Sequence, residues 1–262
     1  MIKIEKAVLP SSEHWEFAIK GMRNPLNSWK MSDSEYVKVG LNERDYIVGD
    51  KDEELAMRLS RAGSEHRKYL RQLPVCLQIT APFYWWKEFE TYKVGTVSNS
   101  CSTMHTIAKR PFVMGDFSTE HLITTDYIFS MFDVEEDKDI YDDLLVDASS
   151  LDNRSEEYSP YGMLKLTIKT LNMYRELYVK ALDRPDDFAE RYKMTPKDVW
   201  WQLIQLLPSS YNQTRSVTLN YEVIANIYGQ RRNHKLDEWN ELCGWFEQHV
   251  PYFETMIAPI FR

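Results

Sequence analysis

Residues 206–243 restrict the possible fold more than any other part of the sequence. After the turn-forming Pro208, apolar side chains recur at helical spacing, which predicts a helix with one stripe facing the interior. Asn220 and Arg231 fall on the same stripe, about 16 Å apart at the usual rise of a helix. Each needs a partner, because a buried amide or guanidinium left unpaired costs several kcal/mol. Other protein atoms, the rim of the stripe or a bound ligand could each meet that need.

Composition limits the class of protein and of partner. A chain of 262 residues with 43% hydrophobic content can bury the core of one large domain, or of one domain with an insertion. The net charge of −8 argues against a nucleic-acid backbone or an anionic membrane as the main partner, since both favour a basic surface. The three cysteines lack disulfide or zinc spacing, and no apolar run approaches about 18 residues. We therefore expect a cytoplasmic protein that is neither secreted nor inserted into a membrane.

Hydrophobic periodicity and capping residues predict an α+β protein with one integrated domain. Strands are expected where apolar and polar residues alternate, at 1–9 and 75–82, with short strands at 36–39 and 46–48. Helices are expected at 12–20, 50–62, 83–94, 161–182, 186–193 and 196–207, with a helical turn at 64–71. Thr195 and Pro196 mark the start of the helix at 196–207, because they are a preferred N-cap and first-turn residue. The acidic segment at about 116–160 lacks calcium-loop spacing and is expected to be a surface insertion.

The segment 95–105 is rich in hydroxyl groups and directly follows the aromatic-rich helix expected at 83–94. It could hold a phosphate or a carbonyl through side chains and backbone N–H groups, or it could be an ordinary polar loop. The sequence contains no G-x-x-x-x-G-K-[ST], G-x-G-x-x-G, H-E-x-x-H or G-x-S-x-G pattern. This argues against phosphate-loop, dinucleotide-fold, zinc-protease and hydrolase chemistry. Because the six histidines are isolated in sequence, no metal site is expected.

Two stretches resemble the flavin-dependent thymidylate synthase family, in a divergent form similar to bacteriophage branches. In that family, a strand ending in an Ala-Pro-like step leads into a helix, an R-H-R motif and an N-E-x-S-x-R-Y motif. The segments ITAP, YWWKEF and NSCSTMH follow the same order here. The family's C-terminal L-P and its asparagine-led helix closed by an arginine resemble LLPSSYNQTRSVTLNYEVIANIYGQRR without a gap. The resemblance implies one domain over 1–262, with a mixed or antiparallel sheet flanked by long helices.

The same resemblance implies roles for particular residues. Arg231 corresponds to the arginine that holds and polarises the pyrimidine ring. The family's serine corresponds to Ser102, or to Cys101 if the register shifts by one residue, so the implied catalytic residues are Arg231 and Ser102. The residues expected near the cofactor are Asn220, Asn226, Tyr92 and Lys93. The residues expected near the nucleotide are Ser98, Asn99, Ser100, Cys101, Ser102 and Arg231.

The sequence departs from the family pattern where the family binds phosphate. Of the R-H-R cations, at most Lys93 remains. The family's glutamate, arginine and tyrosine in the serine motif are replaced by Ser100, Met104 and His105, and a further arginine by Ile204. Because bidentate arginine–phosphate pairs supply much of the affinity for a nucleotide, these changes favour an altered site as an alternative.

The resemblance implies flavin-dependent methylation of dUMP to dTMP, with FAD as cofactor and methylene-tetrahydrofolate and NADPH as co-substrates. It further implies a homotetramer with FAD between subunits, and a pyrimidine nucleotide as the ligand. One alternative is a nucleotide-binding or assembly protein that keeps the fold without the chemistry. Another is a flavin enzyme that acts on a different pyrimidine.

Overall fold

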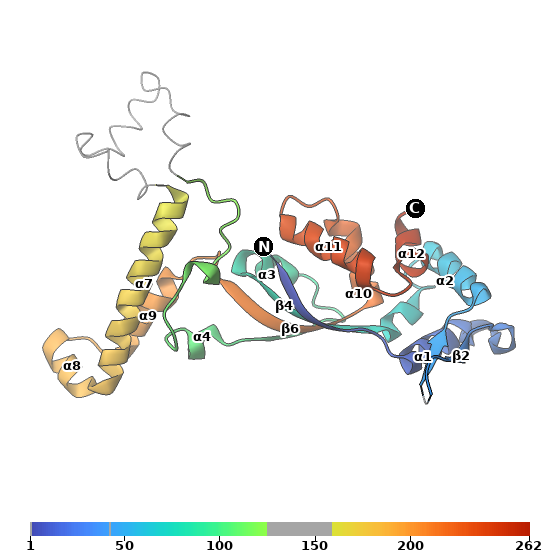
Figure 1. Cartoon of the computed structure of the whole chain (residues 1–262), viewed down its shortest axis with the longest axis horizontal. Helices are drawn as coiled ribbons and strands as arrows, with labels where there is room; N and C mark the ends of the chain where they lie inside the picture. Colours follow the sequence, from blue (N-terminus) through green and yellow to red (C-terminus); the bar gives the residue numbers. More distant parts are fainter. Residues whose placement is uncertain (1, 42, 125–158) are drawn as a thin grey trace, which may run out of the picture. The chain divides into compact units, whose positions relative to one another are not determined.

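A computed structural model describes residues 2–41, 43–124 and 159–262 (Figure 1). These residues form two compact units. One unit contains the chain up to Cys101 together with Gln213–Arg262, and the other contains Ser102–Asn212. Most of the acidic insertion expected at 116–160 lies outside the described residues, and the single integrated domain stays a prediction.

The first unit is built on a four-stranded antiparallel sheet. In spatial order its strands are β1 (Lys3–Val8), β4 (Pro74–Pro82), β6 (Asn212–Asn220) and β5 (Val97–Ser100). β1 pairs antiparallel with β4, and β5 pairs antiparallel with β6. Two side-chain contacts, Cys76–Thr218 and Thr80–Thr214, show that β4 and β6 also run in opposite directions. A separate hairpin consists of β2 (Glu35–Lys38) and β3 (Arg44–Ile47).

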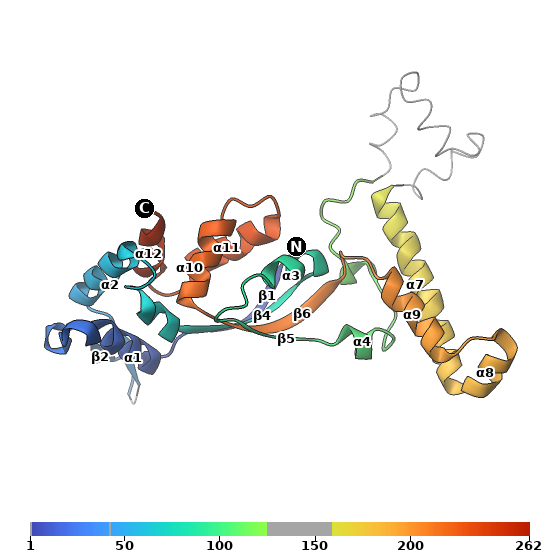
Figure 2. The ribbon, with the colours of Figure 1, turned by 180° about the vertical axis from the view of Figure 1, so that it is seen from behind.

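One face of this sheet forms the main core. Side chains alternate across a strand, and in β4 every second residue is buried: Val75, Leu77, Ile79 and Ala81. Three helices lie on one side of the sheet in both views (Figures 1 and 2): α3 (Phe83–Phe89), α10 (Tyr221–Arg231) and α11 (Asp237–His249). The same unit contains α1 (Ser12–Arg23), α2 (Asp50–Ala62) and α12 (Phe253–Met256). The predicted α+β class with an antiparallel sheet and flanking helices is confirmed.

The second unit is helical. Its helices are α4 (Thr103–Thr106), α7 (Pro160–Asp183), α8 (Pro185–Tyr192) and α9 (Pro196–Leu206). Buried apolar residues of α7 and α9, including Leu171 and Leu203, pack in one cluster. Thr195 caps the start of α9, as the sequence predicts, and also forms a reciprocal capping box with Asp198. None of the helices in the described ranges is both long enough and apolar enough to cross a lipid bilayer.

Three expectations between residues 83 and 220 are wrong in part. The helix expected at 83–94 ends at Phe89, and the expected loop at 95–105 contains strand β5 and the short helix α4. The segment before α10 is a strand, so Asn220 is the N-cap residue of α10 and does not lie on its inward stripe. In β6, Val217 and Leu219 are buried, whereas Ser216 and Thr218 are exposed. A search for helical spacing does not detect this alternation.

A buried ion pair fastens α1 to α2. Arg23 is 5% exposed and donates from Nε to Asp52, which is fully buried. Asp52 also accepts hydrogen bonds from the backbone N–H and the hydroxyl of Ser34 at 3.3 and 2.6 Å. Removing only one charge of such a pair leaves the other buried without compensation.

We expect Asp52→Ala to lower the free energy of unfolding by about 3–5 kcal/mol, because Arg23 would remain buried without its carboxylate. Glu54→Ala is the matched control, since Glu54 is an exposed carboxylate of the same helix. Its effect should stay within about 0.5 kcal/mol. Urea unfolding monitored by tryptophan fluorescence measures both, and equal effects of the two substitutions would contradict the role of the ion pair.

Candidate functional site

Helix α3 brings one carboxylate into an aromatic environment. Trp85, Trp86 and Phe89 are buried, and their rings contact one another. Glu88 lies between them in sequence, with 36% of its side chain exposed. Its Oε2 atom accepts a hydrogen bond of 3.0 Å from the indole Nε1 of Trp239 on α11. α3 therefore presents a negative charge to α11 at a fixed place.

Arg231, the last residue of α10, pairs with this carboxylate. Its Nη1 atom is 2.8 Å from Glu88 Oε2 and 2.8 Å from His234 Nε2. Its Nε atom donates to the hydroxyl of Tyr92 over 3.0 Å. The guanidinium carbon lies 4.8 Å from the centre of the Trp239 ring, which is a favourable cation–π distance. The segment that contains Glu88 and Tyr92, which is distant in sequence, and the nearby His234 and Trp239 thus hold this guanidinium in one orientation.

One nitrogen of the Arg231 guanidinium takes no part in these hydrogen bonds. Only 17% of the side chain is exposed, and Nη2 has no hydrogen-bond partner within the residues that the structure describes. The partners of Arg231 are therefore mainly protein atoms, as one of the sequence alternatives proposed. A single additional acceptor could still bind at Nη2.

A shallow pocket lies next to Tyr92. Its volume is about 100 Å³, and its lining includes Tyr92, Lys93, Thr96 and Ser98. The Oγ1 atom of Thr96 is buried and has no hydrogen-bond partner among the residues that the structure describes. Gly95 adopts φ +81°, and a Cβ atom there would lie 2.9 Å from Nδ2 of Asn220. This glycine allows the loop after α3 to pack directly against the start of α10.

The two asparagines of α10 differ in environment. Asn220 accepts a hydrogen bond of 3.0 Å from the backbone N–H of Val223, which makes it the helix cap. Asn226 is exposed. The cofactor contacts implied for Asn220 and Asn226 stay a prediction.

The residues expected near the nucleotide have different local environments, and their shared role stays a prediction. Ser98 lines the pocket beside Tyr92, whereas Asn99 lines a separate cavity of about 320 Å³. Ser100 pairs in register with Arg215 of β6. The backbone N–H of Cys101 donates to Thr214 O over 3.0 Å, and the Cys101 side chain is exposed. Ser102 belongs to the second unit, where its hydroxyl accepts from the N–H of His105 at the start of α4.

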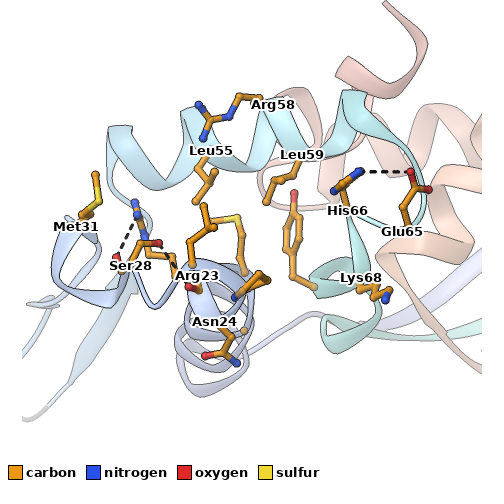
Figure 3. Close-up of a pocket in the computed structure, with 15 residues that line it drawn as sticks. Arg23, Asn24, Ser28, Met31, Leu55, Arg58, Leu59, Glu65, His66 and Lys68 are labelled. Atoms are coloured by element: carbon orange, nitrogen blue, oxygen red, sulfur yellow. Dashed lines mark hydrogen bonds and ion pairs between the residues drawn. The ribbon is translucent and has the colours of Figure 1, made fainter.

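A larger cavity lies between α1, α2 and the 3-10 helix Lys68–Gln72 (Figure 3). Its volume is about 570 Å³, and its walls are mainly apolar, with Leu55 and Leu59 pointing from α2 toward α1. Arg58 and Lys68 at its edge have no ion-pair partner within the described ranges. Burial raises the pKa of the phenol of Tyr69, which also lines the cavity.

Sequence reasoning missed both Glu88 and this cavity. A lone carboxylate in an aromatic helix is a signal for a cationic partner, because a partly buried charge needs one. The cavity gives no sequence signal, since its residues come from segments that meet only in the fold. Within the described part of the chain, no three His, Cys, Asp or Glu side chains gather where they could hold a metal ion.

Comparisons with known proteins place the fold. No protein-family profile matches the chain, and no curated protein matches it. Thymidylate synthase X from Helicobacter pylori, crystallised with FAD and dUMP, is similar in structure at 14% identity, with a TM-score of 0.53 over 100% of this chain and 99% of that one. A second Helicobacter pylori structure, of the flavin-dependent enzyme complexed with FAD and dUMP, has 13% identity and a TM-score of 0.53 over 98% and 97% of the chains.

The UMP/dUMP methylase PolB from Streptomyces cacaoi, bound with 5-Br dUMP, has 12% identity and a TM-score of 0.53 over 100% of this chain and 94% of that one. Likeness at this level of identity shows the fold: this chain has the fold of flavin-dependent thymidylate synthases over its full length. The roles of individual residues have to come from the contacts themselves.

We expect Glu88→Ala to lower the free energy of unfolding by about 1–3 kcal/mol, because Arg231 and the Trp239 indole would both lose their acceptor. The matched control is Glu254→Ala, which removes the carboxylate of an exposed pair with Arg262. That substitution should cost less than about 1 kcal/mol. Thermal and urea unfolding of the two variants measure the difference, and a loss for Glu254→Ala as large as that for Glu88→Ala would contradict it.

Proposed function

We propose that this protein binds a pyrimidine nucleotide and FAD and methylates the pyrimidine, as flavin-dependent thymidylate synthases do with dUMP. In this proposal Arg231 contacts the base. Lys93, Thr96 and Ser98, which line the pocket next to Tyr92, contact the rest of the nucleotide. Methylene-tetrahydrofolate as methyl donor, NADPH as reductant and a homotetrameric assembly are parts of the same proposal, taken from the resemblance.

This proposal rests on the contacts that hold the Arg231 side chain in one orientation. Protein atoms fix its Nε and Nη1, and its face is held against Trp239, so little side-chain entropy remains to be lost when a ligand binds. Nη2 retains its donor capacity for one ligand oxygen or nitrogen. An arginine prepared in this way can position a carbonyl of the base and draw electron density toward it.

The cavity between α1 and α2 is our candidate for the FAD site, in place of Asn220, Asn226, Tyr92 and Lys93, which the resemblance implies and which do not line this cavity. FAD combines flat, largely apolar ring systems with a diphosphate, and this cavity combines apolar walls with Arg58 and Lys68 at its edge. Its volume of about 570 Å³ falls in the usual range of about 300–1,000 Å³ for cofactor sites. The pocket beside Tyr92, at about 100 Å³, is too small for a dinucleotide. When bound, FAD would supply the redox chemistry that the methylation requires.

A second candidate function is supported by Glu88. Its carboxylate offsets the charge of Arg231 at 2.8 Å, and a neutralised guanidinium polarises a carbonyl less than a free one. The chain could therefore bind nucleotide on this scaffold, or act in an assembly, without methylating the base.

Flavin and nucleotide binding test the proposed function. We expect the purified protein to show flavin absorbance or, after loading with FAD, a rise in melting temperature, and dUMP to perturb the flavin spectrum. In Arg231→Ala the affinity for dUMP should fall by about ten- to a hundredfold, the loss of one charged hydrogen bond and its contacts. Its affinity for FAD should change by less than about threefold.

Arg232→Ala is the matched control, since it removes the same charge from the next position, where the side chain is exposed. It should keep the dUMP response. A protein that is colourless and gains no thermal stability from FAD would overturn the proposed function. A protein that binds both ligands and transfers no methyl group would favour the second candidate.

The proposed place of FAD has its own test. We expect the double variant Arg58→Ala/Lys68→Ala to weaken FAD binding by about tenfold, since charge-assisted contacts to the diphosphate would be lost. Lys51→Ala/Arg61→Ala removes two exposed cations that do not line the cavity, both from the same helix α2, and should leave FAD affinity unchanged. Titration followed by flavin fluorescence measures both, and equal FAD affinities in the two double variants would place FAD elsewhere.

A further inference from the structure

We infer that Glu88 is the residue that makes the site specific for uracil, by accepting the ring N3–H while Arg231 donates to the neighbouring carbonyl. This inference rests on the proposed function and adds the recognition of the base to it. It rests on two atoms of the ion pair, Glu88 Oε1 and Arg231 Nη2, that make no hydrogen bond to the described residues.

The two oxygens of Glu88 have different environments. Oε2 accepts from Arg231 Nη1 at 2.8 Å and from Trp239 Nε1 at 3.0 Å. Oε1 has no hydrogen-bond partner among the residues described. The Glu88 side chain is 36% exposed, so a ligand can approach it from solvent. Glu88 is therefore saturated on one side and retains a full acceptor on the other.

Arg231 has the complementary asymmetry, since Nε and Nη1 are occupied and Nη2 is not. Glu88 Oε1 and Arg231 Nη2 are each two covalent bonds from an atom of the ion-pair contact, so an acceptor and a donor lie next to that contact. Arginine–carboxylate pairs are frequently bidentate, with both oxygens and two nitrogens engaged. This pair is monodentate, which leaves one acceptor and one donor for a ligand.

The chemistry of the free pair matches one edge of uracil. That edge presents an N–H donor between two carbonyl acceptors, so Glu88 can take the N3–H and Arg231 can donate to an adjacent oxygen. Because the two side chains together carry no net charge, they favour a neutral amide edge over a phosphate. A site built to hydrogen-bond a ligand N–H discriminates strongly against an analogue that lacks it.

Rigid surroundings preserve this arrangement. Trp239 contacts both members of the pair, through its Nε1 to Glu88 and through its ring face to Arg231. Tyr92 holds Nε of Arg231, and its own hydroxyl donates to Gln230 over 2.9 Å. The donor and the acceptor are thus fixed before a ligand arrives, which lowers the entropy lost on binding.

Binding of three nucleotides to the FAD-loaded protein tests this inference: dUMP, N3-methyl-dUMP and dCMP. We expect the wild-type protein to bind dUMP at least about tenfold more tightly than either of the others, since each lacks the N3–H. In Glu88→Ala this preference should fall to about threefold or less. Glu88→Gln should restore part of it, because the amide oxygen can accept the same N–H. Glu254→Gln, in the exposed pair with Arg262, should keep the full preference.

The outcomes separate this inference from the proposed function. If the wild-type protein binds none of the three nucleotides, the proposed function fails and the specificity of Glu88 fails with it. If dUMP binds but N3-methyl-dUMP or dCMP binds equally well, only the role of Glu88 is overturned. It is also overturned if Glu88→Gln, or a folded Glu88→Ala, loses thermal stability while its preference for dUMP stays at the wild-type level, since that pattern belongs to a purely structural ion pair.

Discussion

The ion pair between Glu88 and Arg231 is the contact on which the candidate site depends. It joins the end of α3 to the end of α10, and the indole of Trp239 adds α11 to the same junction. These helices lie on one face of the sheet (Figures 1 and 2), so the pair fixes a cation at the surface of the main core. Each charge offsets the other in a mainly aromatic environment, where the side chains of Arg231 and Glu88 are 17% and 36% exposed.

The same pair restricts the chemistry available to Arg231. A guanidinium already engaged by a carboxylate is a weak ligand for a phosphate dianion, so the proposed function requires another group to bind the nucleotide phosphate. Lys93 is exposed beside the pocket that contains Ser98, and it supplies one cation for that purpose. Under the proposed function, the carboxylate that engages Arg231 and the single lysine of the pocket next to Tyr92 favour recognition through the base over recognition through the phosphate.

The elements that could be predicted from sequence are those specified by local chemistry. Thr195 and Asp198 determine the start of α9, and the clean alternation from Val75 to Ala81 determines β4. α3 ends five residues before the expected position, because the chain must turn at Gly95 to pack on Asn220. This packing joins segments that are distant in sequence, as do the contact of Arg231 with Glu88 and the cavity near Arg58. No local sequence pattern can therefore predict these three features.

Strand geometry explains why the polar residues from Ser98 to Ser100 of β5 do not form a single cluster. Neighbouring side chains of a strand point to opposite faces. Ser98 pairs with the buried Val217 and lies on the face of the helices, whereas Asn99 pairs with the exposed Ser216 on the other face. A loop could have brought all these hydroxyls and amides to one ligand, but a strand can offer only every second one. The site therefore has to be completed by groups from other segments, and Tyr92, Lys93 and the free donor of Arg231 are the groups that the fold provides on the face of Ser98.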